Sequence, residues 1–378
     1  MRLLFVTSSL SHGGAERQTI ALASRLAERG HECHFAYLKP DAGQLERLRG
    51  AASVTCLQAR RYLDFNALRT LRRLTRGMQS IVAVNQYAIF YARLAAPRLP
   101  LMATFHTTVL QGAKERLKML YYRPFFWSAD RLVFVCEAQR RYWEQRRLSG
   151  RRTDVIHNGI DTAHWAPVTP ASRRAMRRAL GFDEGDLVVA LSAVLRREKN
   201  PLQLVDAIAA LRRRRIPARA LLVGDGPLRG AVEARARKLG IGEHVVITGL
   251  QQDVRPMVGA ADAAVLCSTA VEKFSLAALE AIALGKPVVL ADLGGAAEMI
   301  RPGIDGWLFA PGDTHALVER LAALADPAAR ARMGCSAREQ VESRFAEAAM
   351  VERYEAALSE LATTRSKHGN LRKPAGAH

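Results

Sequence analysis

Two glutamates, Glu272 and Glu280, stand with seven residues between them in the segment EKFSLAALEAIALG. Ser275 suits a helix N-cap, which predicts that Glu272 lies in a loop and Glu280 in the second turn of the following helix. That helix is otherwise apolar on every face, so we expect it to be buried. A buried carboxylate needs a hydrogen-bonding partner, which here can be ligand hydroxyls, a structural arginine or a backbone amide. The amides that begin the helix would suit a diphosphate.

Three basic residues follow the apolar run Leu187–Val194, which predicts a buried strand. They are Arg196, Arg197 and Lys199, and they fall where ligands bind in open α/β sheets, after the carboxyl end of a strand. We therefore expect them to bind an anion. The run Arg212–Arg215 is instead interpreted as a solvated face.

The first half of the chain gives weaker signals. His106 ends the predicted strand Leu101–Phe105, where it can contact a ligand or simply hydrogen-bond to the backbone. Gly13 and Gly14 permit close approach of the backbone to a ligand, although turn geometry alone would also explain them.

Short apolar runs alternate with helix-period segments, which indicates parallel sheets covered by helices on both faces. The pattern breaks at the turn His157–Asp161 and then restarts. A length of 378 residues also exceeds what one hydrophobic core usually organises. We therefore expect two doubly wound α/β domains. The predicted first helix is Ala15–Glu28, and the predicted strands are Leu3–Ser8, His34–Leu38, Ile81–Asn85, Leu101–His106, Leu132–Cys136, Val155–Ile156, Leu187–Val194, Ala218–Val223, Val245–Thr248, Ala263–Leu266 and Val288–Ala291.

The expected domains are residues 1–160 and 161–345. A last helical segment, 346–362, is expected to return to the first domain. Residues 363–378 contain almost nothing apolar and are predicted to form a disordered basic tail.

Motifs along the chain resemble, in order, those of the family 4 glycosyltransferases, which belong to the glycosyl transferases group 1. The glutamate pair, followed by Gly285–Val289, resembles the family's signature ahead of a GxPVV strand. Together the motifs are far more specific than any one alone, and the resemblance covers roughly residues 1 to 360. The other matches are Gly13–Arg17 for the N-terminal glycine loop, Asn158–Asp161 for the NGVD turn, Val223–Pro227 for VGxGP, Gly294–Glu298 for GGxxE and Asp305–Gly306 for DGxxG.

The resemblance implies the GT-B fold, in which two Rossmann-like domains face a cleft that holds the active site. It implies a retaining glycosyltransferase that takes a sugar from a nucleoside-diphosphate sugar, bound mainly by the second domain. We expect a UDP-sugar rather than a GDP-sugar as donor. The expected acceptor, bound by the basic first domain, is a lipid-linked or surface glycan.

The resemblance also implies roles for individual residues. Glu280 would bind the donor ribose, and Glu272 the donor sugar. His106 and Glu272 would be the catalytic residues, with His106 near the donor sugar and the acceptor. The remaining expected site residues are Arg196, Lys199, Phe274, Ser275 and Leu276 at the diphosphate, and Gly13, Gly14 and Arg17 in a loop lining the cleft. Many family members carry GRL before the lysine, whereas this chain has Ala193-Val194-Leu195, so Arg196 or Arg197 is expected to replace the missing arginine.

No Asp-x-Asp pair and no cluster of histidines and carboxylates has the spacing of metal ligands, so we expect transfer without a metal or other cofactor. The Gly224-x-Gly226 sequence suggests a dinucleotide site, but the next glycine, Gly230, comes one residue late for that fingerprint. NAD is therefore not expected.

The chain is strongly basic, with 56 lysines and arginines against 36 acidic residues. Residues 1–160 hold 26 of the basic and 11 of the acidic residues. In this half, the segments Arg60–Arg76, Lys114–Trp127 and Arg140–Arg152 mix basic with aromatic and apolar residues. Such segments suit an anionic membrane surface, although arginine stems on an ordinary surface would look similar. No nucleic-acid-binding signature accompanies the charge, so nucleic acid is not an expected partner.

The sequence contains no apolar run of membrane-spanning length and no signal-peptide pattern. We expect a cytoplasmic protein that can attach to the inner face of the membrane. Two other function classes remain open at this point. One is a non-hydrolysing nucleotide-sugar epimerase, and the other is a non-catalytic protein that binds nucleotide sugars or polyanions.

Overall fold

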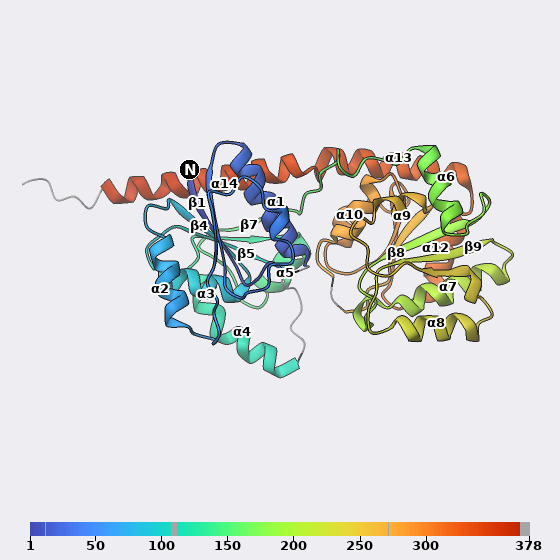
Figure 1. Cartoon of the computed structure of the whole chain (residues 1–378), viewed down its shortest axis with the longest axis horizontal. Helices are drawn as coiled ribbons and strands as arrows, with labels where there is room; N and C mark the ends of the chain where they lie inside the picture. The colour runs from blue at the N-terminus through green and yellow to red at the C-terminus, as the bar shows by residue number, and fades with distance from the viewer. Residues whose placement is uncertain (12, 107–111, 271, 371–378) are drawn as a thin grey trace, which may run out of the picture. The chain divides into compact units, whose positions relative to one another are not determined.

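A computed structural model describes the chain except residues 12, 107–111, 271 and 371–378 (Figure 1). The chain forms two compact units. Unit 1 comprises Met1–Asn158 and the residues from Ala348 onward, and unit 2 comprises Gly159–Glu347. The described residues of each unit contain one parallel sheet, so the prediction of two Rossmann-like α/β domains is confirmed.

The sheet of unit 1 has seven parallel strands in the order β3-β2-β1-β4-β5-β6-β7. Strand β1, in the interior of the sheet, is buried on both faces, because Leu4 and Val6 point to one helical layer while Leu3 and Phe5 point to the other. The strands are β1 (Arg2–Thr7), β2 (Glu32–Tyr37), β3 (Ser53–Cys56), β4 (Ser80–Val84), β5 (Leu101–Phe105), β6 (Arg131–Phe134) and β7 (Thr153–Val155).

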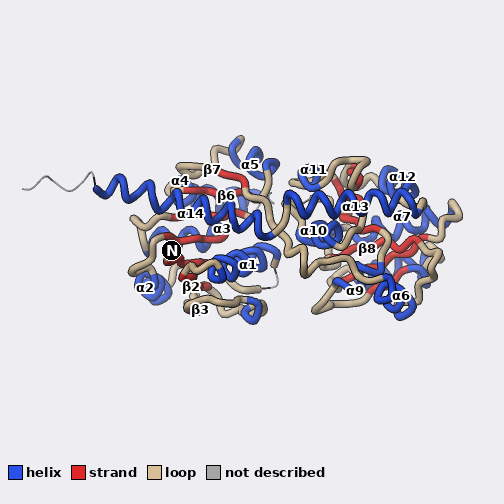
Figure 2. The backbone as a smooth tube through the Cα atoms, turned by 90° about the horizontal axis from the view of Figure 1, so that it is seen from above, coloured by secondary structure: helices blue, strands red, loops and turns tan. Residues whose placement is uncertain are grey.

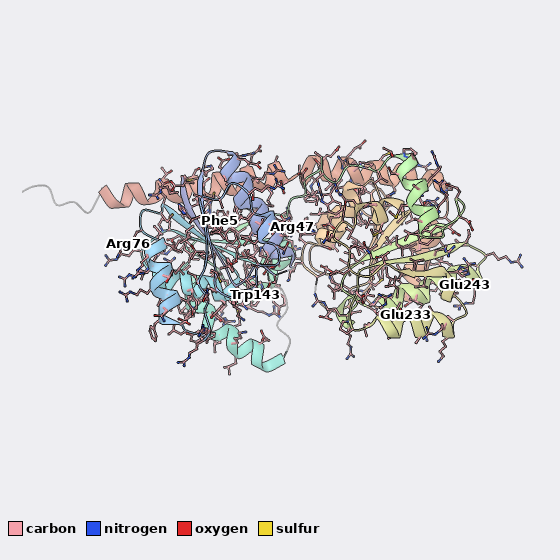
Figure 3. The ribbon with its side chains drawn as sticks, viewed as in Figure 1. Phe5, Arg47, Arg76, Trp143, Glu233 and Glu243 are labelled. Atoms are coloured by element: carbon pink, nitrogen blue, oxygen red, sulfur yellow. The ribbon has the colours of Figure 1, made fainter. Side chains whose placement is uncertain are left out.

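Helices cover both faces of this sheet. Helices α1 (Gly14–Glu28) and α14 (Glu347–Asn370) share one apolar cluster with strand β1, and Figure 2 shows α14 running across the strands of unit 1 beside α1. Helices α2 (Phe65–Leu74), α3 (Asn85–Ala95), α4 (Gly112–Trp127) and α5 (Glu137–Glu144) pack on the other face. Phe5 and Trp143, both labelled in Figure 3, belong to the two different layers.

Helix α14 corresponds to the returning helix expected over residues 346–362. Its apolar residues Val351 and Leu358 are fully buried against unit 1. The helix continues to Asn370, so the prediction of a disordered tail from residue 363 is wrong for its first eight residues. Once the first half of the 24-residue helix is packed on unit 1, adding further turns needs no new nucleation, so the helix can continue into a polar segment. The rest of the predicted tail, 371–378, lies outside the described residues.

The sheet of unit 2 has six parallel strands in the order β10-β9-β8-β11-β12-β13. These are β8 (Leu187–Ser192), β9 (Ala218–Val223), β10 (Val245–Ile247), β11 (Ala263–Leu266), β12 (Val288–Ala291) and β13 (Gly306–Phe309). Helices α7 (Pro201–Arg213), α8 (Arg229–Lys238) and α12 (Thr314–Ala323) cover one face, and α9 (Arg255–Ala260) and α10 (Leu276–Ala283) cover the other. The remaining helices are α6 (Pro170–Ala179), α11 (Ala296–Met299) and α13 (Pro327–Arg344).

Every strand expected from the sequence overlaps an observed strand. The prediction missed two, β3 and β13, which lie at the edges of their sheets. Edge strands are short and only partly covered, so their apolar pattern is weak. Strand β3 is partly exposed along its whole length, and β13 begins with a glycine.

Candidate active site

The strand order of unit 2 changes direction between β8 and β11. In open parallel sheets, ligands bind beyond the carboxyl ends of strands at such a switch point. The loop after β8 carries Arg196 and Lys199, and the loop after β11 carries Glu272. The topology thus brings together two segments that are some seventy residues apart in the chain, and they contain the predicted anion-binding and sugar-binding side chains.

Lys199 and Glu272 form a close ion pair. Lys199 Nζ donates to Glu272 Oε2 at 2.6 Å, and Ser268 Oγ donates to the same oxygen at 2.8 Å. The side chains of Lys199 and Glu272 are only 22% and 13% exposed, so water screens the pair incompletely. Ser268, which is buried, was not predicted as a site residue. An ammonium group has three donors, so Lys199 can hold Glu272 and a further anion at once.

Backbone contacts hold the two loops together. The N–H of Thr269 donates to the carbonyl of Glu198 at 3.0 Å. Residues Arg197–Lys199 form a single 3₁₀ turn, and the left-handed Asn200 then starts helix α7 with a φ of 47°. This turn directs Lys199 toward the loop after β11.

Helix α10 begins beside Glu272. Ser275 is its N-cap, as predicted, and its hydroxyl accepts a hydrogen bond from the N–H of Ala278. Glu280 lies in the second turn and is 4% exposed, so its predicted burial is also confirmed. Phe274, just before the N-cap, packs edge to face on Phe345 at a centroid distance of 5.1 Å. The start of a helix presents amides without intrahelical partners and the positive end of the helix dipole.

Gly294 supports the loop that carries Glu272. Its φ is +59°, and a Cβ atom at this position would lie 2.3 Å from the carbonyl oxygen of Glu272. The next N–H, that of Gly295, donates to the carbonyl of Lys273 at 2.6 Å. Gly294 and Gly295 therefore hold the glutamate loop through their backbones, and the contact at position 294 requires glycine.

The Gly224-x-Gly226 segment has a similar role on the other loop. A Cβ atom at Gly224 would lie 2.1 Å from the carbonyl oxygen of Ala193, and one at Gly226 would lie 2.6 Å from that of Leu195. The N–H of Leu195 donates to the carbonyl of Asp225 at 2.9 Å. The two glycines therefore pack the loop that precedes Arg196, a role that spacing alone did not reveal.

Arg196 lies in the same loop as Lys199 and is more exposed. Its Nε is 3.8 Å from Glu198 Oε1, and the arginine side chain is 53% exposed. Arg197 is exposed as well. The structure therefore brings Lys199 into the Glu272 cluster, and places both arginines at its solvent side.

Lys286, in the GxPVV segment, is separate from this cluster. It lies at the amino end of β12, where its Nζ donates to the carbonyl of Gly259 at 2.7 Å. Burial lowers the pKa of Lys286 to about 8. This lysine therefore has a structural position at the opposite edge of the sheet.

In unit 1, His106 follows β5 and is 7% exposed. Its backbone N–H donates to Asn85 Oδ1 at 3.0 Å, and Asn85, just after β4, has a φ of 67°. His106 lines a small cavity with Gln18, Thr104 and Asn158. His106 thus lies at the carboxyl edge of its sheet, where ligands bind in this class of fold.

The glycine loop of unit 1 leads directly into helix α1. Gly13 is the N-cap of α1 and Gly14 its first residue, while Arg17 lies in the first turn. A Cβ atom on Gly13 would collide with the carboxylate of Glu16, at 2.1 Å. The carbonyl of Gly13 accepts a hydrogen bond from Gln44 Nε2 at 3.3 Å. Because β1 and β5 are parallel strands of one sheet, Gly13 and His106 both follow strands at the same edge of the unit 1 sheet.

Within the described part of the chain, no three histidine, cysteine or carboxylate side chains gather as metal ligands would. The described helices likewise include none that combines the length and apolar character needed to cross a bilayer.

Comparison with known proteins identifies two family models in the chain. The model described as Glycosyltransferase Family 4 matches residues 12–164, and the model described as Glycosyl transferases group 1 matches residues 172–340. Together they span most of both units.

Curated relatives agree with these matches. EpsD of Bacillus subtilis is 32% identical over 248 residues, which is 64% of this chain and 64% of EpsD. A GDP-mannose-dependent phosphatidylinositol monomannoside mannosyltransferase of Mycolicibacterium smegmatis is 34% identical over 221 residues, or 56% of this chain and 57% of the relative. The chain therefore aligns with less than two thirds of the length of these two relatives.

Among solved structures, HepE of Anabaena, crystallised with UDP, superposes with a TM-score of 0.86 at 24% identity. The match covers 95% of this chain and all of HepE, which shows a shared GT-B fold. With the ordered motifs, the two family models and this fold, the chain belongs to glycosyltransferase family 4.

Proposed function

We propose that this protein is a retaining glycosyltransferase that uses a nucleoside-diphosphate sugar, with UDP favoured over GDP as the nucleotide. The proposed acceptor is a lipid-linked or surface glycan. The observation that carries the proposal is the Lys199–Glu272 pair at the switch point of unit 2, beside the start of the helix that buries Glu280.

Each part of the donor has a matching group in unit 2. Lys199 and Arg196 supply positive charge for the diphosphate, and the start of α10, from Phe274 to Leu276, supplies amides and the helix dipole. Glu280 accepts hydrogen bonds from the ribose hydroxyls. Glu272 accepts hydrogen bonds from the sugar hydroxyls. An ionised carboxylate only accepts hydrogen bonds, which fits both of these roles.

Negative charge develops on the diphosphate as the bond to the sugar breaks. Lys199 and the dipole of α10 stabilise that charge, and their fixed positions are what makes such stabilisation effective. The departing diphosphate can itself take the proton of the acceptor hydroxyl, so no separate protein base is required. His106 and Glu272 position the reacting groups, and transfer proceeds without a metal.

Unit 1 supplies a surface suited to the inner face of an anionic membrane. Tyr62 and Tyr121 are about half exposed, and their rings lie 5.8 Å apart. This ring contact joins the loop before α2 to α4, where Phe65 is 75% and Leu117 is 71% exposed. Helix α2 adds exposed arginines at its end. Exposed aromatic residues among arginines favour binding at a lipid interface.

Vesicle sedimentation tests this surface. Binding to vesicles that contain phosphatidylglycerol should weaken steeply with salt, while pure phosphatidylcholine vesicles should bind far less. Equal binding to both vesicles would reject membrane attachment.

The function itself is tested with a panel of UDP-sugars and GDP-sugars, with and without lipid-linked and oligosaccharide acceptors. We expect nucleotide release that depends on the acceptor and a product whose anomeric configuration matches the donor. An altered but intact nucleotide sugar would instead identify an epimerase. Binding without turnover on any acceptor would favour a non-catalytic protein.

A further inference from the structure

A second cavity opens in unit 1, at the edge of the sheet opposite to His106. Its volume is about 580 Å³, within the range of pockets that hold small molecules. The walls come from residues that precede or begin strands β5, β6 and β7, together with the last turn of α3 and the middle of α14. The proposed function assigns it no role. Five arginines line it: Arg93, Arg98, Arg131, Arg151 and Arg152.

Two carboxylates in the wall are each shared between two arginines. Asp130 pairs with Arg93 at 3.3 Å and with Arg151 at 3.1 Å. Glu360, from α14, accepts hydrogen bonds on one oxygen from Arg131 and Arg152, both at 2.8 Å. The arginines hold the pKa of Glu360 below its usual value, Arg131 contributing most.

A third carboxylate, that of Asp154 on β7, pairs with two of these arginines. It lies 2.8 Å from Arg131 and 3.6 Å from Arg152. Among the residues that the structure describes around this cavity, five arginines thus face three carboxylates, which leaves two positive charges in excess.

The arginines differ in exposure in a way that suits ligand binding. Arg131 is 5% exposed and fixed by two carboxylates, so it forms a rigid base. The side chains of Arg151 and Arg152 are 72% and 61% exposed, so they can turn toward a ligand from the solvent side. A guanidinium presents a planar fork of N–H donors that matches the oxygens of a phosphate.

We propose that this cavity binds a dianionic phosphoryl group. A phosphate monoester carries about 1.5 to 2 negative charges at pH 7, which matches the excess of the cavity. The cavity is large enough for the phosphoryl group to be part of a larger compound. That compound is either a soluble phosphorylated metabolite or a lipid whose headgroup is a phosphate monoester, and both present the same chemistry.

The test uses the full chain and inorganic phosphate as the probe, titrated by calorimetry. The double variant Arg151→Gln/Arg152→Gln removes the excess charge but leaves Asp130 paired with Arg93, and Glu360 paired with Arg131. The fold should therefore persist, and phosphate affinity should fall roughly tenfold or more. The matched control, Arg213→Gln/Arg237→Gln, removes two exposed arginines from unit 2 and should bind as the parent does.

Phosphate that binds elsewhere, including at the donor site, contributes equally to the parent and the double variant. The difference between them therefore reports on the cavity, whether or not the proposed transferase function holds. A second variant, Glu360→Gln, removes one negative charge from the cavity wall, while Arg131 and Arg152 keep Asp154 as a partner. It should tighten phosphate binding roughly twofold to fivefold. Equal phosphate affinity in the parent and the double variant would overturn the proposal, as would weaker binding by a folded Glu360→Gln protein.

Vesicles distinguish the two sources of the phosphoryl group. Vesicles with 20% phosphatidic acid in phosphatidylcholine are compared with phosphatidylglycerol vesicles of equal charge, because the surface on α2 and α4 would bind both. The parent and the double variant are floated with each, at a salt concentration where the control variant still binds. Flotation on phosphatidic acid that falls in the double variant more than flotation on phosphatidylglycerol indicates a lipid headgroup. An equal change on both vesicles, together with the loss of phosphate binding, indicates a soluble compound.

Discussion

Replacing Lys199 by methionine should selectively weaken the diphosphate contact. The substitution keeps the apolar stem and removes the ammonium group, which lies 2.6 Å from Glu272 and is positioned to reach an anion as well. A charge-assisted hydrogen bond contributes about 1.5 to 3 kcal/mol, which corresponds to a loss of roughly tenfold to hundredfold in nucleoside-diphosphate affinity. The same loss should apply to the sugar nucleotide, because the diphosphate is common to both ligands.

Glu272→Gln should behave differently. It removes the proposed contact to the sugar and also releases Lys199 from its ion pair, so the free nucleoside diphosphate should bind at least as tightly as to the parent. The sugar nucleotide should bind more weakly. The side chains of Lys199 and Glu272 are both less than a quarter exposed, so their ion pair should stabilise the fold more than a surface pair does. From the unfolding free energies of the two single variants and the double variant, we expect a coupling free energy between the two residues of roughly 1 to 2 kcal/mol.

Calorimetric titration of UDP, GDP and their sugar derivatives against both single variants and the double variant measures these effects. Lys238→Met, an exposed lysine elsewhere in unit 2, serves as the charge-matched control. If Lys199→Met binds the nucleoside diphosphate as tightly as the parent, the assignment of Lys199 to the diphosphate is wrong. If Glu272→Gln loses as much diphosphate affinity as Lys199→Met, the proposed division between the two residues is wrong.

Three further predictions concern the glutamate loop, a buried lysine and metals. Gly294→Ala places a Cβ atom against the Glu272 carbonyl and should lower the affinity for the sugar nucleotide roughly tenfold in a calorimetric titration. Gly312→Ala is the control, because Gly312 also has a positive φ but no atom lies within 4 Å of the added Cβ, and this variant should keep the affinity of the parent. Burial lowers the pKa of Lys286 from 10.5 to about 8, so between these pH values the lysine is protonated only in the unfolded state. The unfolding free energy of the parent should therefore rise by about 3 kcal/mol from pH 8 to pH 10.5, relative to that of Lys286→Met. Denaturant unfolding that shows the same difference between the two proteins at both pH values would disprove this. Turnover should survive a chelator, and a loss that magnesium or manganese restores would contradict the metal-independent mechanism.

Sequence patterns predicted the central strands well, because strands buried on both faces leave continuous apolar runs such as LLFV and LVVAL. They also predicted the cap at Ser275 and the burial of Glu280, since both follow from local chemistry. The edge strands β3 and β13 escaped prediction because their exposed residues break the apolar pattern.

The geometry of the candidate site could not be predicted without the order of the strands in the sheet. Ser268 carries no sequence signal of its own, and it matters because β8 and β11 are neighbours in the sheet although β9 and β10 separate them in the chain. Gly224 and Gly294 act through backbone contacts between distant loops, which no local spacing can reveal. The length of α14 was underestimated because its last turns have little apolar character.

The central claim is that unit 2 holds a nucleoside-diphosphate sugar with its ribose on Glu280, and calorimetry of Glu280→Gln tests it most directly. The change keeps the volume and one acceptor oxygen but removes the charge, so affinity for the free nucleoside diphosphate and for the sugar nucleotide should both fall roughly tenfold to hundredfold. Glu243→Gln, at a surface site labelled in Figure 3, should bind both ligands as the parent does. If a folded Glu280→Gln protein binds the nucleoside diphosphate as tightly as the parent, the ribose assignment is wrong.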